Sequence, residues 1–251
     1  EQDLPFGSYY IKELQAPDGF VSSDEIIEVT VSYQGQDVEV VRLKEIFKNQ
    51  PTTVEFTKSD LTTGVELDGA TLTVLDKDGD EIDKWTSVKG EPHIIKRLHV
   101  GETYTLREEF APYGYLKAEE VEFTITDTAE IQKVEMKDDV PIGRIIINKK
   151  GEFLSEVTWN EMVAGAMDSI WGYVTGSLKD VTFEIYARED VKAADGESDD
   201  YYKKDELVAT ITTDELGFAR SDDLPLGKYY VVEKETANGF VLDGEPRDID
   251  L

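Results

Sequence analysis

The sequence contains no cysteine, only two histidines and far fewer basic than acidic residues. Without cysteine, a disulfide framework and thiol chemistry are both excluded. His93 and His99 lack the spacing of a zinc site, and neither a glycine-rich phosphate loop nor a nucleophile elbow occurs. We therefore expect no cofactor, no metal site and no enzyme that turns over substrate.

Basic residues are scarce: 26 lysines and arginines stand against 55 acidic residues, which gives a net charge of −29. A chain without a basic surface is unsuited to nucleic acid, so we expect no nucleic-acid partner. No apolar run is long enough to span a bilayer, and neither a leader nor a sorting signal is evident. Because Glu1 opens within a repeat, we interpret the sequence as an internal part of a longer protein.

One motif occurs three times: YYIKELQAPDGF from Tyr9, YTLREEFAPYGY from Tyr104 and YYVVEKETANGF from Tyr229. Each copy has a glutamate four positions after the first tyrosine and a glycine six positions later. The third copy reads TANG where the others read APDG and APYG.

The repeated glutamates are Glu13, Glu108 and Glu233. Side chains alternate between the faces of a strand, so each glutamate shares the apolar face of its strand. Glu109 competes weakly with Glu108, because it falls on the outward face. A buried carboxylate is costly without a partner, so a partner should recur as well.

Lysines and amide or carboxyl side chains recur at matching places. Lys58 is in phase with Val54 and Phe56, and Lys149 follows a similar apolar strand. At the far end of the first two repeats, Asn49 and Asp138 lie in phase with an apolar neighbour.

The adjacent Asp139 competes with Asp138 for this position, since the following link is one residue longer than the link after Asn49.

Lysine on a first strand, glutamate before a Pro/Gly turn, and Asn or Asp on a last strand resemble the B-type repeats of Gram-positive collagen-binding surface proteins and the related SpaA-like pilin domains. The resemblance covers nearly the whole chain. It implies an autocatalytic isopeptide bond in which lysine attacks the Asn or Asp side chain while glutamate moves protons. For the middle repeat, it implies that Lys58 is the attacking amine, Glu108 moves the protons and Asp138 is attacked.

Physical chemistry permits this reaction, because burial lowers the pKa of an amine and raises that of a carboxyl group. Holding the groups in contact can contribute roughly 7–11 kcal/mol to such a step. The alternative is an ordinary buried ion network, or a Lys58 that reaches the solvent at the rim.

Alternating apolar and polar segments separated by turn-formers predict an all-β fold of sandwiches. The resemblance implies that these are tandem prealbumin-like (Ig-like) sandwiches. We expect the carboxy-terminal part of a first domain in residues 1–49, a complete domain in 50–142, and a third domain in 143–251 that lacks its last strand. The lysine partner of Asn49 and the acceptor for Lys149 would then lie outside the sequence.

Two insertions lengthen the third repeat. Apolar residues from Trp159 to Trp171 recur at helical spacing, which predicts an amphipathic helix near 158–174. This helix either covers its own sandwich or docks a partner. The second insertion, an acidic loop within residues 188–206, does not match a calcium-binding loop.

The resemblance, with which the composition agrees, implies a structural stalk of a cell-wall-anchored surface protein or adhesin, extracellular on a Gram-positive cell and crosslinked by isopeptide bonds. Its partners would be neighbouring repeats in the same chain, with a host extracellular-matrix ligand as a further partner. Two other functions stay open: a ligand-binding adhesin module that uses the Trp159–Trp171 helix or the acidic loop, and a spacer in a secreted carbohydrate-active protein.

Overall fold

The structure is a computed structural model, and it describes residues 4–159 and 169–251. The chain divides into two compact units, Glu1–Asp139 and Val140–Leu251. Every regular element in the described residues is a β-strand, which confirms the predicted all-β class. The described residues contain no helix that is long and apolar enough to cross a membrane. The three predicted domain ranges stay a prediction.

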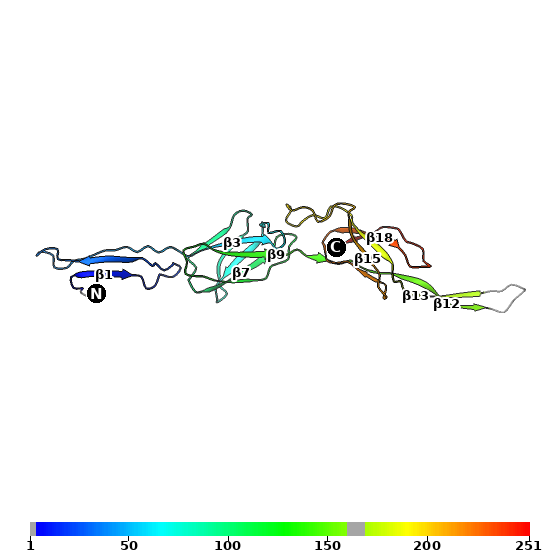
Figure 1. The fold of residues 1–251 in the computed structure, drawn as a ribbon, viewed down its shortest axis with the longest axis horizontal. Helices are drawn as coiled ribbons and strands as arrows, with labels where there is room; N and C mark the ends of the chain where they lie inside the picture. The colour runs from blue at the N-terminus through cyan, green and yellow to red at the C-terminus, as the bar shows by residue number, and fades with distance from the viewer. Residues whose placement is uncertain (1–3, 160–168) are drawn as a thin grey trace, which may run out of the picture. The chain divides into compact units, whose positions relative to one another are not determined.

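The first unit contains the following strands (Figure 1): β1 (Gly7–Lys12), β2 (Ile26–Val31), β3 (Thr53–Asp60), β4 (Thr71–Leu75), β5 (Glu81–Thr86), β6 (His93–Lys96), β7 (Thr103–Phe110), β8 (Val121–Thr124) and β9 (Gln132–Asp138). The second unit contains β10 (Ile142–Gly143), β11 (Ile146–Asn148), β12 (Lys150–Trp159), β13 (Ser169–Ser177), β14 (Thr182–Ala187), β15 (Leu207–Thr212), β16 (Phe218–Arg220), β17 (Leu224–Pro225), β18 (Lys228–Glu235) and β19 (Arg247–Asp250).

Strands β3 to β9 form a sandwich that we call the central sandwich. One sheet has the order β6-β3-β9 and the other the order β5-β4-β7-β8. The first strand, β3, pairs in parallel with the last strand, β9, whereas the remaining pairs are antiparallel. This parallel pairing places the first and last strands of the domain side by side.

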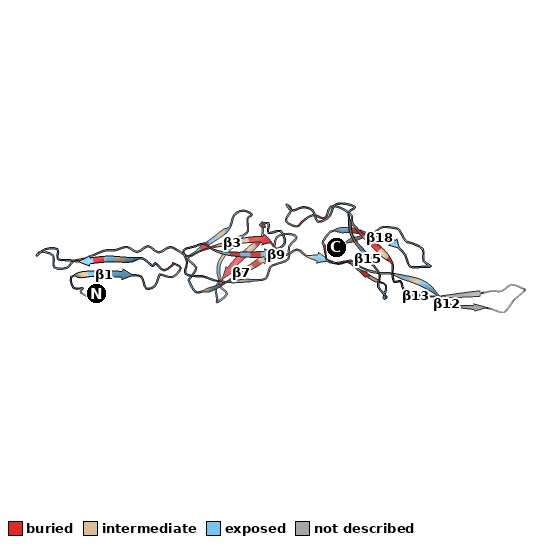
Figure 2. Cartoon of the chain, in the orientation of Figure 1, coloured by how far each residue is buried: buried red, intermediate tan, exposed pale blue. Residues whose placement is uncertain are grey.

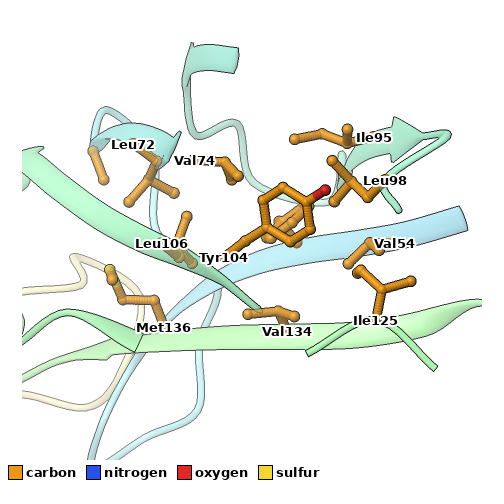
Figure 3. Packing of buried hydrophobic residues seen from close by; sticks show 12 residues of the cluster. Val54, Leu72, Val74, Ile95, Leu98, Tyr104, Leu106, Ile125, Val134 and Met136 are labelled. Carbon is orange, nitrogen blue, oxygen red and sulfur yellow. The ribbon is translucent and has the colours of Figure 1, made fainter. Parts of the chain in front are cut away.

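The inner faces of the two sheets meet in one apolar core (Figure 3). Val54 and Phe56 of β3 follow the period of two expected for a half-buried strand, and their outward neighbours are more exposed. Figure 2 shows buried stretches on β3 and β7. Leu72 of β4 and Leu106 of β7 pack opposite them from the other sheet. Lys58, two positions after Phe56 and also buried, extends this core toward the end of β3.

Residues before β3 join the central sandwich through the first motif. Val21 donates a backbone hydrogen bond to Gln50, and Thr52 donates one to Gly19. Gly19 has a φ of +79°, and a Cβ there would lie 2.5 Å from the carbonyl oxygen of Arg97. Glycine is therefore required at this position of the motif, both for its conformation and for the close approach.

The second unit contains a sheet of order β15-β14-β18-β19, together with the pairs β11–β16 and β10–β17. Its core is separate and includes Phe183, Ile185, Tyr229 and Val231. The third motif thus lies on β18, a strand that packs into this core, as the second motif does on β7.

The predicted helix near 158–174 is wrong where the structure describes these residues. Thr158 and Trp159 end β12, and the residues from 169 to 174 belong to β13, with Thr158 paired to Ile170. Residues 160–168, which carry the middle of the predicted helix, lie outside the described residues. The β-branched residues of these two strands and Gly172 have low helix propensity. Cross-strand pairing of β12 with β13 therefore outweighs the helical spacing of the apolar residues.

Replacing Leu106 by alanine should destabilise the first unit. Leu106 is fully buried in the core, so Leu106→Ala should lower the free energy of unfolding by about 2–5 kcal/mol. Leu14 is 96% exposed, and Leu14→Ala should change this free energy by less than about 0.5 kcal/mol. Urea unfolding measures both, and equal effects would contradict the assigned core.

Candidate functional site

Lys58 and Asp138 meet because β3 and β9 run in parallel. In this register Lys58 lies opposite Met136, and Asp60 lies opposite Asp138, so the long lysine side chain extends along the pair to reach the aspartate. The Nζ atom of Lys58 donates a hydrogen bond to Oδ1 of Asp138. The first and last strands of the central sandwich are thus in contact through their side chains.

Glu108 completes the cluster from the opposite sheet. It lies on β7, and its Oε1 is 3.0 Å from Nζ of Lys58. Its other oxygen, Oε2, accepts a hydrogen bond of 2.7 Å from the backbone N–H of Ala118. We call Lys58, Glu108 and Asp138 the triad.

The triad is enclosed by the core, since its side chains are between 0% and 1% exposed. Burial raises the pKa of Asp138 from 3.8 to about 6; Lys58 lowers it, and the nearby Glu108 raises it further. Among the described residues, Oδ2 of Asp138 and Oε1 of Glu108 have no hydrogen-bond partner. An amine, a readily protonated carboxyl group and a second carboxyl group are therefore held together away from bulk solvent.

The competing residues lie elsewhere. Asp139 is exposed, and its backbone oxygen accepts a hydrogen bond from Leu116. Glu109 is only half-buried, on the outward side of β7. The structure thus brings Lys58 together with Asp138 and Glu108 rather than with either neighbour.

The first copy of the motif brings Glu13 together with Asn49. The Nδ2 of Asn49 donates a hydrogen bond of 2.7 Å to Oε2 of Glu13, and the backbone N–H of Ser23 donates one of 2.8 Å to the same oxygen. Both side chains are half-buried. In the described residues no lysine forms an ion pair or hydrogen bond with either side chain.

The third copy brings Lys149 together with Glu233. The Nζ of Lys149 lies 2.6 Å from Oε2 of Glu233, and the glutamate is buried while the lysine is 23% exposed. A cavity of about 150 Å³ adjoins this pair and is lined by apolar residues such as Phe183 and by charged residues such as Asp243 and Arg247. In the described residues no Asn or Asp side chain hydrogen-bonds to Lys149: Asp243 lines the same cavity, but its carboxylate accepts a hydrogen bond from Arg247.

Sequence reasoning missed Asp60, Tyr115 and Ala118. Asp60 is buried, and its oxygens accept hydrogen bonds from the backbone N–H groups of Thr62 and Thr63 and from the Tyr115 hydroxyl. The phase of Asp60 with Lys58 could have indicated its burial. No side-chain pattern could have indicated Ala118, because it acts through its backbone.

No group of three or more potential metal ligands is arranged around an ion site in the parts of the chain that the structure describes. The hairpin between β4 and β5, rich in aspartate, is held instead by Asp76, which accepts hydrogen bonds from the backbone of Asp78 and Asp80.

Comparison with known proteins identifies related domains. A family model described as the SpaA prealbumin-like fold domain matches residues 1–45, 52–140 and 173–251. No curated protein matches the chain.

Several solved structures are similar. The TIE protein of Bacillus anthracis is 26% identical with a TM-score of 0.49, over 98% of this chain but only 39% of that one. BcpA, the major pilin subunit of Bacillus cereus, is 13% identical with a TM-score of 0.34, over 80% of this chain and 95% of that one. A streptococcal ancillary pilin is 15% identical with a TM-score of 0.32, over 99% and 72%.

The pKa of Asp138 predicts how stability depends on pH in a variant that cannot crosslink, Lys58→Met. Folded Asp138 binds its proton more tightly than the unfolded chain, so its stabilising effect is complete below pH about 4 and is lost as the pH rises through about 6. Removing Lys58, which lowers this pKa, shifts the loss to higher pH. The slope should not exceed about 1.4 kcal/mol per pH unit.

Urea unfolding of Lys58→Met at several pH values measures this dependence. The control is Lys58→Met combined with Asp138→Asn, in which the titrating group is absent and the slope should decrease. Identical slopes in the two variants would show that Asp138 does not titrate in this range.

Proposed function

Since the chain belongs to the SpaA family of prealbumin-like fold domains, we propose that it is a structural segment of a bacterial surface protein whose central sandwich forms its own Lys58–Asp138 isopeptide bond. The observation that carries this proposal is the contact of Lys58 with Asp138 and Glu108 inside a closed core. The family match also confirms the prealbumin-like fold predicted from the three motifs.

The proposed reaction is a single condensation. The neutral amine of Lys58 attacks Cγ of protonated Asp138, and Glu108 donates a proton to the departing hydroxyl oxygen and then takes a proton from Nζ. The Nζ–Cγ bond forms, the Cγ–O bond breaks, and one water leaves, so Glu108 ends in the state in which it began. A cavity of about 10 Å³ beside Lys58, lined also by Phe56 and Trp85, is about the size of one water molecule.

Several features of the site support this reaction. The raised pKa of Asp138 favours the protonated acid, from which a hydroxyl group leaves as water. Contact between the reacting groups replaces the entropic cost of a bimolecular amide synthesis. Each chain reacts once, so we propose self-crosslinking and not turnover of a substrate.

The bond would stabilise a domain that has no disulfide. It would close a loop of 80 positions, for which the chain-entropy model gives a stabilisation of about 4 to 5 kcal/mol. It would also join the first strand of the sandwich to the last, so that tension along the chain passes through the bond. Such a device suits a stalk exposed to force and proteases at the cell surface, with neighbouring repeats as its partners.

The other two copies support incomplete forms of the same site. We propose that Glu13 with Asn49, and Lys149 with Glu233, are two-residue counterparts of the triad.

Intact mass tests the crosslink. Wild type should be lighter than its sequence by the mass of one water, and Lys58→Ala and Glu108→Ala should not be, because each lacks a reacting group. Asp138→Asn should lose one ammonia instead, since an amide releases ammonia when an amine attacks it. Glu109→Ala, beside the triad but facing outward, is the control and should crosslink like wild type.

Peptide mapping should then find a branched peptide that joins Lys58 to Asp138. A wild-type mass equal to that of the sequence would leave the triad as a buried ion network and would refute the proposed reaction.

Stretching single molecules tests the mechanical role. With the bond in place, the residues between Lys58 and Asp138 cannot extend, whereas Lys58→Ala should release up to about 270 Å more chain, at ~3.4 Å per residue. Lys137→Ala removes an exposed lysine of β9 and should behave like wild type. Equal extensions for wild type and Lys58→Ala would contradict a bond that carries the load.

A further inference from the structure

We infer that the backbone N–H of Ala118 positions Glu108 for crosslinking, by holding Oε2 as a hydrogen-bond acceptor so that the proton to be transferred lies on Oε1, beside Lys58. This inference rests on the proposed function and adds a group that the three side chains of the triad do not include.

The two oxygens of Glu108 have different surroundings. Oε2 accepts the Ala118 N–H at 2.7 Å, whereas Oε1 lies 3.0 Å from the Lys58 amine and has no hydrogen-bond partner among the described residues. One oxygen is thus tied to the backbone, and the other faces the reacting groups.

A protonated carboxyl group has one oxygen that only accepts hydrogen bonds and one that carries the proton. The N–H of Ala118 needs an acceptor, because a buried donor without one costs about 1–3 kcal/mol. Placing the proton on Oε2 would direct an O–H toward this N–H. The backbone therefore favours the form of Glu108 with its proton on Oε1, where the proposed reaction requires a donor.

The same hydrogen bond recurs in the first copy of the motif. There the backbone N–H of Ser23 donates to Oε2 of Glu13 at 2.8 Å, and in both copies the donor lies ten positions after the glutamate. Two independent occurrences at one spacing indicate that the APDG and APYG turns return the chain to its glutamate.

The third copy, whose turn reads TANG, differs. Asp243 is the residue ten positions after Glu233, and its carboxylate pairs with Arg247. Oε2 of Glu233 accepts its hydrogen bond from Lys149, and in the described residues Oε1 has no partner. The backbone donor thus accompanies the APxG turn and is not a general feature of a buried glutamate.

The segment that presents this N–H is fixed at two further points. The backbone N–H of Leu116 donates to the oxygen of Asp139 at 2.8 Å, and the Tyr115 hydroxyl donates to Oδ2 of Asp60 at 2.8 Å. These bonds tie the β7–β8 connection to the ends of β9 and β3, which carry Asp138 and Lys58. The donor therefore keeps its place relative to all three reacting side chains.

An ester at residue 118 tests the inference. Incorporating lactic acid in place of Ala118 during cell-free translation of the whole chain exchanges the N–H for an oxygen and keeps the side chain. Samples quenched at intervals give the rate of water loss and of Lys58–Asp138 peptide formation. We expect the ester to slow crosslinking on the order of ten- to a hundredfold, and Ala118→Ser, which keeps the N–H, to react like wild type.

A second comparison separates positioning from folding. The ester is placed in Lys58→Ala chains, which cannot crosslink, and their urea midpoint is compared with that of Lys58→Ala alone. Slow crosslinking with a nearly unchanged midpoint supports positioning. An unchanged rate, or a slow rate matched by a large loss of stability, overturns the inference. A wild-type chain that never loses water refutes the proposed function itself.

Discussion

Parallel pairing of β3 with β9 is the constraint on which the central sandwich and its site depend. It places residues 80 positions apart in contact, and it does so inside a core where an ionised side chain is costly. Lys58 and Asp138 offset part of that cost for each other, and Glu108 reaches them from the facing sheet. Because β3 is the first and β9 the last strand of the central sandwich, a covalent bond between them would enclose nearly the whole domain in one loop.

The three copies of the motif place one type of side chain in three environments. Glu108 lies between a lysine and an aspartate, Glu13 accepts from an asparagine, and Glu233 pairs with a lysine beside a cavity. The shared element is a glutamate directed inward from a strand before a turn. What differs is the set of neighbouring groups, and under the proposed function this set would determine which copy could carry out the condensation.

The chain combines small sandwiches, a large negative charge and a complete lack of cysteine. Small domains bury a limited fraction of their surface, so they gain much from any link that restricts the unfolded chain. The proposed isopeptide bond would serve this purpose without an oxidising environment or a cofactor. The β12–β13 pair is an addition to this arrangement, since in the described residues these two strands pair only with each other.

Alternation of apolar and polar residues by itself determined the all-β class and the inward direction of Lys58, Glu108 and Asp138, because the period of a strand is local. It did not determine that β3 pairs with β9, that Asp60 lies opposite Asp138, or that the Ala118 N–H meets Glu108. These depend on which distant segments become neighbours, and Ala118 acts through a backbone group that every residue except proline has. The predicted helix failed for the same reason: its spacing was local, and cross-strand pairing in the folded chain decided otherwise.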